Sequence, residues 1–288
     1  MKTLLLIDAN SLIYRCFFAL PPFTTKEGKA SGALYGLSTV LMKIFREQSF
    51  DFVVAFFDRP EPTFREKIYK EYKAHRPPTP NELIEQIKEA HELFNQFGIK
   101  TFEVPSFEAD DLIGTAVEKF KNLSDLKIII FTGDLDTLQL IDNHKITVET
   151  FKKGVSNITI YDEEAVKNRF GVLPEQIIDY KGLVGDPSDN IPGVKSIGPK
   201  TAASIIQKYG SLENFLETGG KEKSYPKIFE NEEIARLSKN LATIRRDAPL
   251  EITNLDELKY QKPPTEKLAI YLEKLGFKSL VDRINKLF

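Results

Sequence analysis

The sequence has one cysteine, three histidines and no tryptophan among its 288 residues. The single thiol, Cys16, excludes a disulfide within the chain and is typical of a protein from a reducing compartment. His75, His91 and His144 lie far apart and lack the spacing of a zinc site. The sequence also has no phosphate-binding loop of the G-x-x-x-x-G-K-[ST] type and no pattern that indicates a Ser-His-Asp nucleophile.

Long hydrophobic runs are absent as well. The N-terminal MKTLLLI has only four apolar residues in a row before Asp8, which is too short for a signal peptide. No stretch approaches the ~20 apolar residues that a membrane-spanning helix needs. We therefore expect a soluble cytoplasmic protein without a membrane partner.

The chain also has little excess charge of either sign. Its net charge of −2 gives no overall signature of nucleic-acid binding, although clustered acids could hide basic residues elsewhere in such a sum. Hydrophobic residues make up 41% and charged residues 28%, an ordinary globular balance. A chain of this length forms one large domain or two modest ones.

What the sequence does contain is four short apolar runs that are each followed by acids. The runs are Lys2–Ile7 before Asp8, Phe52–Phe57 before Asp58, Ile99–Val104 before Glu108, Asp110 and Asp111, and Lys127–Phe131 before Asp134 and Asp136. Short continuous apolar runs are typical of buried strands in parallel sheets. Ligands of open parallel sheets bind beyond the carboxyl ends of the strands, where these acids are expected to gather.

These seven acids, together with Asp186 and Asp189, predict a site for hard divalent cations. Gathered carboxylates repel one another unless a cation neutralises them. Oxygen ligands without nearby His or Cys favour Mg²⁺ or Mn²⁺, and two such ions can clamp a phosphodiester. For any one of these acids, a helix-dipole partner or a turn residue is the better explanation, but that explanation does not account for acids at all four strand ends.

The first half alternates strand-like and helix-like segments, which predicts an α/β fold with a mostly parallel central sheet flanked by helices. Helices are expected at 11–20, 32–48 and 81–97, and from a Ser106 cap past Glu108 to about Leu123. A strand pair is expected at 146–151 and 156–161, around a turn at Lys152–Gly154. From Asp162 onward, short helices are expected at 162–169, 174–184, 199–208, 211–216, 232–245 and 265–274, with one weak strand at 250–253. A boundary near Gly171 divides a core of 1–171 from a helical part of 172–288, which we expect to cap the sheet.

Residues 191–210 contain a glycine-rich turn followed by an amphipathic helix. Gly193 and Gly198 bracket the turn, and Pro199 stands at a natural first helical position. With the preceding helix, this is the layout of a helix-hairpin-helix at about 174–210, which grips a nucleic-acid backbone through N–H groups and lysines such as Lys195 and Lys200. An ordinary helical hairpin that uses glycine for turning explains the pattern about equally well.

Residues 61–81 form a charged segment that we expect to be exposed and mobile. Basic side chains from Arg65 to Arg76 alternate with Tyr69 and Tyr72. Aromatic residues among cations can stack on unpaired bases while the cations hold phosphates. A solvated charged helix face is the alternative.

Taken in order, these segments resemble one family. The matching segments are Ile7–Ser11, Phe57-Asp58, Thr63–Arg65, Tyr72–Pro78, Glu108–Asp111, Thr132–Asp136 and Gly185–Gly193. Together they resemble the 5′-nuclease superfamily, which includes flap endonucleases, and most closely the 5′→3′ exonuclease domain of bacterial DNA polymerase I. The resemblance covers residues 1 to at least 220.

The resemblance implies a structure-specific, divalent-metal-dependent 5′→3′ exonuclease or flap endonuclease, acting in RNA-primer removal and DNA repair. Its implied cofactors are two or more Mg²⁺ or Mn²⁺ ions, with K⁺ at the glycine turn. One ion would be held by Asp8, Asp58, Glu108, Asp110 and Asp111, and the second by Asp134, Asp136, Asp186 and Asp189. Residues 61–81 would form a helical arch in which Lys73 and Arg76 reach the scissile phosphate and Tyr72 stacks on a base. Arg65, Tyr72, Gly193, Lys195, Gly198 and Lys200 would contact DNA.

The implied partners are DNA with 5′ flaps, nicks or free 5′ ends, including RNA-primed ends, and a DNA polymerase. A monomer associated with the nucleoid is expected. The sequence departs from the family pattern at Ala9, where Gly is common, and at Leu37, where an aromatic residue is common. No polymerase follows residue 288, so a stand-alone nuclease and an excised domain both stay open. A PIN-like endoribonuclease and a non-catalytic DNA-binding module are the alternative functions.

Overall fold

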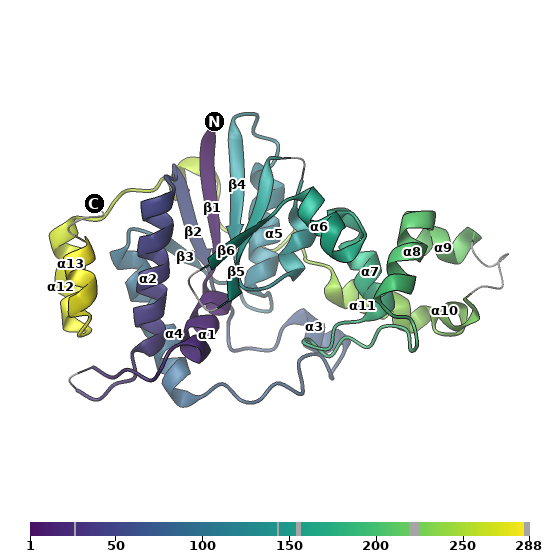
Figure 1. Ribbon diagram of the computed structural model, residues 1–288, viewed down its shortest axis with the longest axis horizontal. Helices are drawn as coiled ribbons and strands as arrows, with labels where there is room; N and C mark the ends of the chain where they lie inside the picture. The colour runs from purple at the N-terminus through teal and green to yellow at the C-terminus, as the bar shows by residue number, and fades with distance from the viewer. Residues whose placement is uncertain (26, 143, 154–156, 219–224, 285–288) are drawn as a thin grey trace.

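The protein is built around one six-stranded sheet. The computed structural model describes residues 1–288 except 26, 143, 154–156, 219–224 and 285–288. The strand order is β3-β2-β1-β4-β5-β6, in which β6 alone is antiparallel to its neighbour. The strands are β1 (Lys2–Asp8), β2 (Phe52–Phe56), β3 (Lys100–Phe102), β4 (Leu126–Phe131), β5 (Ile146–Lys153) and β6 (Asn157–Tyr161). The predicted mostly parallel α/β sheet is confirmed (Figure 1).

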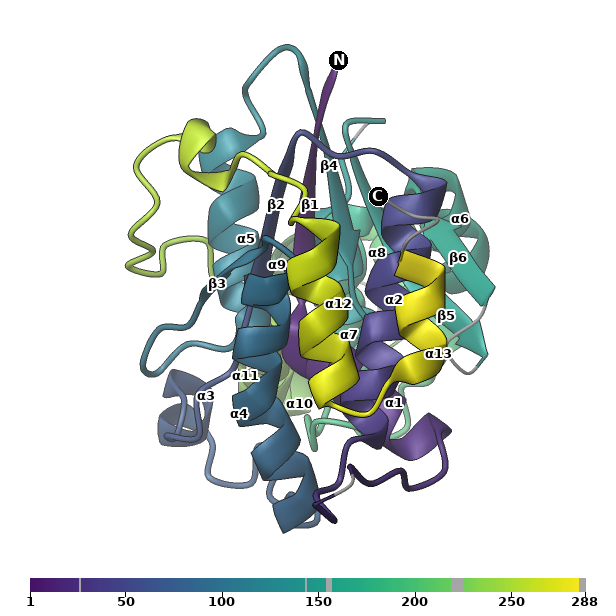
Figure 2. The same cartoon turned by 90° about the vertical axis from the view of Figure 1, so that its left-hand side faces the viewer.

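Helices cover both faces of this sheet. Alternate residues of β1 show the division, since Leu4 and Leu6 belong to the core on one face and Leu5 and Ile7 to the core on the other. The first face is covered by α5 (Ala109–Phe120). The second face is covered by α1 (Ala9–Ala19), α2 (Gly32–Glu47) and α4 (Asn81–Gln96), with α12 (Thr265–Lys274) and α13 (Lys278–Ile284) packed outside α2 and α4 (Figure 2).

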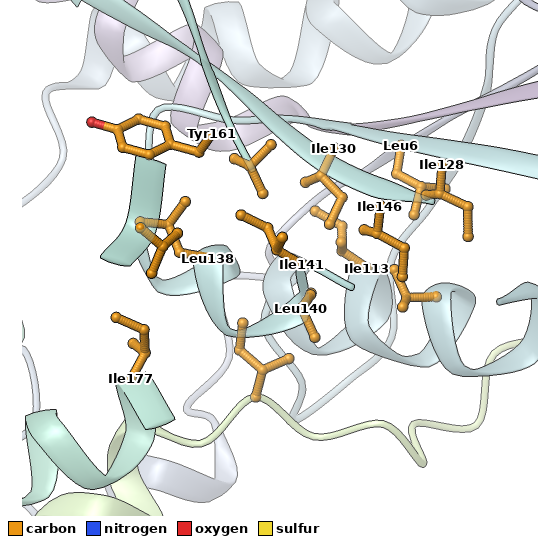
Figure 3. Packing of buried hydrophobic residues seen from close by; sticks show 14 of the residues in the cluster. Leu6, Ile113, Ile128, Ile130, Leu138, Leu140, Ile141, Ile146, Tyr161 and Ile177 are labelled. Carbon is orange, nitrogen blue, oxygen red and sulfur yellow. The ribbon is translucent and has the colours of Figure 1, made fainter. Parts of the chain in front are cut away.

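The core beside α5 fixes the elements that carry functional side chains. Ile128, Ile130 and Ile146 from the sheet pack near Ile113 of α5 and Leu138 of the short 3₁₀ helix η1 (Asp136–Leu140) (Figure 3). Each such buried aliphatic side chain contributes about 1.5–3 kcal/mol relative to an exposed one. The start of α5 and the start of η1, which both carry acids, are thereby held against the end of β4.

A second group of helices extends from the β6 side of the sheet (Figure 1). It comprises α6 (Glu163–Phe170), the 3₁₀ turn η2 (Pro174–Gln176), α7 (Ile177–Val184), α8 (Pro199–Tyr209), α9 (Leu212–Thr218), α10 (Pro226–Glu230) and α11 (Glu232–Ala242). The chain then returns along the sheet through η4 (Leu255–Leu258), where the Tyr260 N–H donates to the Asp51 carbonyl at 2.8 Å. Since α12 and α13 lie at the opposite end of the molecule from α8, residues 172–288 are not one continuous helical cap.

Several local expectations are wrong. Glu108, not Ser106, is the N-cap of α5, and that helix ends at Phe120 because the chain turns there toward β4. Residues 250–253 form no strand, and α11 ends at Ala242. The predicted hairpin turn at Lys152–Gly154 lies partly outside the described residues. Among the helices that the structure describes, none is long and apolar enough to span a membrane.

The charged segment 61–81 is folded against the protein. It contains the short helix α3 (Phe64–Ile68), capped by reciprocal bonds between Thr63 and Glu66. Arg65 and Tyr72 are only 3% and 4% exposed, whereas residues 67–68, 70–71 and 74–78 are exposed as predicted.

Candidate functional site

Acids from separate elements converge beyond the carboxyl ends of the parallel strands. Asp8 ends β1, Asp58 follows β2, Asp110 lies in the first turn of α5, and Asp134 follows β4. Their mutual repulsion, with that of Asp136, raises the pKa of Asp110 well above its usual range, after burial as the larger cause. These five predicted residues therefore share one buried site.

Asp8 and Asp58 are held in place by backbone and hydroxyl donors. Asp8 caps α1 by accepting from the Ser11 N–H at 2.9 Å and accepts from the Thr132 hydroxyl at 2.7 Å. Asp58 accepts from the Ala109 N–H at 2.7 Å. Burial first, and the neighbouring acids second, raise the pKa of Asp8 to about 7 and raise that of Asp58. Both carboxylates are costly to ionise without a cation.

Asp110 is the least satisfied acid of the site. Its Oδ1 atom is buried without a hydrogen-bond partner. A buried carboxylate oxygen of this kind normally finds a partner, because leaving it unpaired costs about 1–3 kcal/mol or more. The described residues supply no hydrogen-bond donor or cation to this oxygen.

Asp136 and Asp186 are bridged by a lysine. Lys181 of α7 donates to the Asp136 carboxylate and to Asp186 Oδ2, the latter at 2.6 Å. Burial, followed by repulsion from Asp134, nevertheless raises the pKa of Asp136 to about 7. Asp134 is tied to the same turn, since its Oδ1 accepts from the Asp136 N–H at 2.9 Å. Asp186, a predicted acid of the helical part, is thereby placed next to the acids that follow the strands.

Lys73 and Arg76 reach the acids from the charged segment. Lys73 Nζ lies 2.8 Å from Glu108 Oε2 and 3.7 Å from Asp189 Oδ2, and Arg76 Nη2 lies 2.5 Å from Asp189 Oδ1. The Lys73 side chain is 27% exposed and that of Arg76 is 47% exposed. Both cations therefore lie at the mouth of the site, where a phosphate could meet them.

Tyr72 does not occupy the position expected of it. Its hydroxyl donates to Asp189 Oδ2 at 3.0 Å and to Glu108 Oε2 at 3.2 Å, and its ring is buried. A ring packed in this way has no free face for a nucleobase. The prediction that Tyr72 stacks on a base is not what this structure shows.

Asp111 and Arg65 form a separate, closed ion pair. Arg65 donates to both Asp111 oxygens at 2.7 and 2.8 Å, and the Glu108 and Arg245 N–H groups donate to the same carboxylate. Arg65 also donates to the Leu241 and Thr243 carbonyls, each at 2.9 Å. The predicted roles of Asp111 as a metal ligand and Arg65 as a DNA contact are corrected, because these donors and acceptors are already used inside the protein.

The donor set fits a hard divalent ion, although no ready-made set of three ligands is present within the described part of the chain. Lysine and arginine side chains stand among the acids and neutralise Glu108, Asp136, Asp186 and Asp189. The unpaired Asp110 oxygen and the raised pKa values of Asp8, Asp58 and Asp110 mark where positive charge is lacking. Carboxylate oxygens without His or Cys are ligands for Mg²⁺ or Mn²⁺.

The glycine turn between α7 and α8 is tightly packed at one end and open at the other. Gly193 has a φ of +60°, is buried, and donates its N–H to Ser238 Oγ at 3.0 Å, so that N–H is not available to a phosphate as predicted. Gly198 is the N-cap of α8, and an added Cβ there would meet no atom within 4 Å. Lys195 and Lys200 are exposed beside it. Only the open end of the turn has features suited to binding a nucleic-acid backbone.

Some residues of the site were missed by the sequence reasoning. Lys181, Thr132, Asn10 and Ser11 all hold or orient the acids or their turns. The sequence does place Lys181 five residues before Asp186, but nothing in the spacing shows that the lysine points back toward Asp136. Ser11 makes two such hydrogen bonds. Its N–H donates to Asp8, and its hydroxyl accepts from the Gly133 N–H at 2.9 Å.

Two cavities open onto the acids. One of about 930 Å³ runs past Asp8, Asp58 and Asp110 toward α4. The other, of about 420 Å³, lies between Asp134, Asp136 and Asp186 on one side and α6 and α7 on the other. The acids are therefore accessible from two cavities, and Arg76 lines both of them.

Comparisons with known proteins agree with this architecture. Residues 3–171 match the family model described as 5′-3′ exonuclease, N-terminal resolvase-like domain, and residues 172–266 match 5′-3′ exonuclease, C-terminal SAM fold. The chain is 38% identical over 289 residues to a 5′-3′ exonuclease of Aquifex aeolicus, a match that covers 100% of this chain and 97% of that protein.

Two further matches add length and fold. The chain is 41% identical over 286 residues to DNA polymerase I of Bacillus caldotenax, covering 98% of this chain but 32% of the polymerase, so it spans about a third of that relative. The solved structure of T5 5′-exonuclease with bound divalent metal ions (zinc) superposes with a TM-score of 0.70 at 21% identity, covering 99% of this chain and 97% of the other. At that identity the likeness concerns the fold alone.

Proposed function

The chain belongs to the 5′-3′ exonuclease family and is a nuclease, and from this premise we propose that it hydrolyses DNA phosphodiesters at 5′ ends and flaps with two divalent ions. Mg²⁺ or Mn²⁺ is the proposed cofactor. The observation that carries this proposal is the buried, unpartnered Asp110 oxygen among four further acids. It is supported by the divalent ions in the T5 5′-exonuclease structure.

Asp8, Asp58, Glu108 and Asp110 are proposed to hold one ion, and Asp134, Asp136, Asp186 and Asp189 the second. When bound to these residues, divalent ions would supply water activation and stabilisation of the charge that develops on the phosphate. Thr132 and the Ala109 N–H keep Asp8 and Asp58 oriented toward the site.

Lys73 and Arg76 are the proposed catalytic side chains. Their ammonium and guanidinium groups now contact Glu108 and Asp189, and in the substrate complex they would contact the scissile phosphate. Cations placed against the negative charge that develops on the phosphate lower the barrier to its hydrolysis. The neighbouring carboxylates would then be free to bind the ions.

We assign duplex binding to the open end of the glycine turn. Gly198, Lys195 and Lys200 would hold the phosphate backbone, with K⁺ as a proposed ligand of the turn. The proposed organisation is a nuclease core of 1–171 with an arch at 61–81, followed by a DNA-binding part from 172. RNA-primer removal and DNA repair beside a DNA polymerase, as a cytoplasmic monomer, is the biological role that fits the polymerase I relatives.

Substitution of Asp134 tests the proposed reaction. On a 5′-flapped duplex with Mg²⁺, Asp134→Ala should lower single-turnover cleavage by about 10³-fold or more, while binding to the same DNA changes little. Asp125→Ala is the matched control, because Asp125 is 72% exposed and precedes β4, at the far end of that strand from Asp134.

Three outcomes would overturn the proposal. A wild-type protein that leaves flapped DNA intact in Mg²⁺ would point to a non-catalytic DNA binder. Cleavage of single-stranded RNA in preference to flapped DNA would point to an endoribonuclease. Equal losses of binding and turnover in Asp134→Ala would make that residue structural.

A further inference from the structure

The smaller cavity has a wall that the proposed reaction does not use. Its volume is about 420 Å³, which lies within the range of ~300–1,000 Å³ typical of ligand pockets. The acids Asp134, Asp136 and Asp186 line it. Arg169 and Phe170 at the end of α6 and Tyr180 of α7 line it as well.

Arg169 is held in a fixed position within this wall. Its guanidinium lies 5.6 Å from the Tyr161 ring centroid and 5.3 Å from that of Phe170, and it donates to the Tyr161 hydroxyl. Cation–π contacts of this kind orient a guanidinium without using up its charge. In the part of the chain that the structure describes, no carboxylate pairs with Arg169. The cavity that the acids line is therefore also lined by an oriented cation.

The position of Arg169 links the acids to the glycine-turn helix. Two residues beyond it, the Gly171 carbonyl accepts from the Gln207 side chain of α8, and a Cβ on Gly171 would lie 3.3 Å from that of Ala203. In Figure 1, α6 and α7 lie between the sheet and α8. A strand held at both the acids and α8 would have to cross this wall.

We propose that Arg169 is a phosphate-binding residue for the nucleic-acid strand that runs from the acidic site toward α8. The ligand is a backbone phosphodiester, which a guanidinium binds through two parallel N–H donors. The Phe170 and Tyr180 side chains line the same cavity and would contact the adjoining sugar. This inference rests on the proposed function and adds a contact to it.

The test compares Arg169→Ala with Lys167→Ala. Lys167 is an exposed cation of the same helix, and two residues of an α-helix are separated by about 200° of rotation, so it points away from the cavity. Affinity for a 5′-flapped duplex is measured in EDTA over a series of salt concentrations. Arg169→Ala should weaken binding about tenfold, as for one lost charge-assisted bond, and reduce the slope of log K against log salt by about 0.7–0.9. Lys167→Ala should leave both close to wild type.

Cleavage separates a binding role from a structural one. At saturating DNA with Mg²⁺, the single-turnover rate of Arg169→Ala should stay within about twofold of wild type, because the lost contact is not specific to the transition state. If Arg169→Ala unfolds at a lower temperature than wild type, Tyr161→Phe replaces it as the test variant. This substitution removes only the hydroxyl that holds the guanidinium, and it should weaken binding about two- to threefold.

Equal affinities and salt slopes for the Arg169 and Lys167 variants overturn this inference while wild-type cleavage leaves the proposed function standing. A wild-type protein that neither binds nor cleaves the flapped duplex overturns both.

Discussion

Asp110 and Asp111 are neighbouring acids in the first turn of α5, the first half-buried and the second fully buried, and they have opposite surroundings. Asp111 receives four donors, two of them from the Arg65 guanidinium. Asp110 keeps one buried oxygen without any partner and lies among Asp8, Asp58, Asp134 and Asp136. Because a helix turns about 100° per residue, adjacent side chains of one helix face different neighbours.

The comparison distinguishes an acid that is paired inside the fold from an acid that has no cation as a partner. Arg65 is 3% exposed and permanently charged, so Asp111 is neutralised by the chain itself. The cations near the other acids are more accessible, from 12% exposure at Lys181 to 47% at Arg76. Partly exposed cations of this kind can move when a metal ion or a phosphate arrives, whereas Arg65 cannot move without opening the core.

The largest expected effect is on turnover at Asp110. Asp110→Asn keeps the shape of the side chain but removes its negative charge, so cleavage of flapped DNA in Mg²⁺ should fall about 10³-fold or more. Thermal stability without metal at pH 8 should hold or rise, because a repelled buried carboxylate is removed. A variant that keeps a tenth of the wild-type rate would show that Asp110 is not a ligand.

The next effect is on stability at Arg65. Arg65→Met leaves Asp111 buried without its partner, which typically costs about 3–5 kcal/mol. The matched control is Arg59→Met, which breaks a partly exposed pair with Glu61 and should lower stability far less. Urea denaturation measures both variants. Equal losses would mean that the closed pair does not support the fold.

The double variant Arg65→Met with Asp111→Asn sharpens that result. Removing both charges should restore part of the stability that the single variant loses, since no unpaired charge is left in the core. A double variant that is less stable than Arg65→Met would contradict the assignment.

The smallest effect concerns pH. Asp8 and Asp136 have folded-state pKa values of about 7 against an ordinary value of 3.8, so between about pH 4 and 7 the folded state keeps protons that the unfolded state has released. Stability without metal should therefore fall as pH rises through that window and level off above it. Denaturation in EDTA at pH 5, 6, 7 and 8 should show a steeper fall for wild type than for Asp136→Asn. The same dependence of stability on pH in both proteins would show that Asp136 does not titrate in this window.

Much of the fold followed from local sequence. The apolar run Leu4–Ile7 is buried on both faces, as a central parallel strand requires, and the run ends at an acid because the chain leaves the sheet there. The glycine at 171 does end α6 with a φ of +75°. The strand 99–104 was overestimated, since only Lys100–Phe102 pairs with β2 at the edge of the sheet.

The sequence locates the site but does not show which of its acids can bind a metal ion. All nine acids are predicted as ligands because the sequence shows only their spacing. Asp111 belongs with Arg65, a partner 46 residues away, and Lys181 joins Asp136 from 45 residues away. Charge composition predicted that most of the segment 61–81 is exposed, but not that Arg65 and Tyr72 are buried. Their burial depends on where Asp111, Glu108 and Asp189 lie.

The order of residues along the chain is enough to place the acids at one edge of a parallel sheet, because strand direction fixes which end each residue following a strand must occupy. Which of these acids are neutralised by the protein's own cations depends on how distant segments pack together. Asp111 meets Arg65 and two backbone N–H groups, whereas Asp110 meets other acids, and that distinction arises from side-chain direction and long-range packing, which spacing along the chain does not encode.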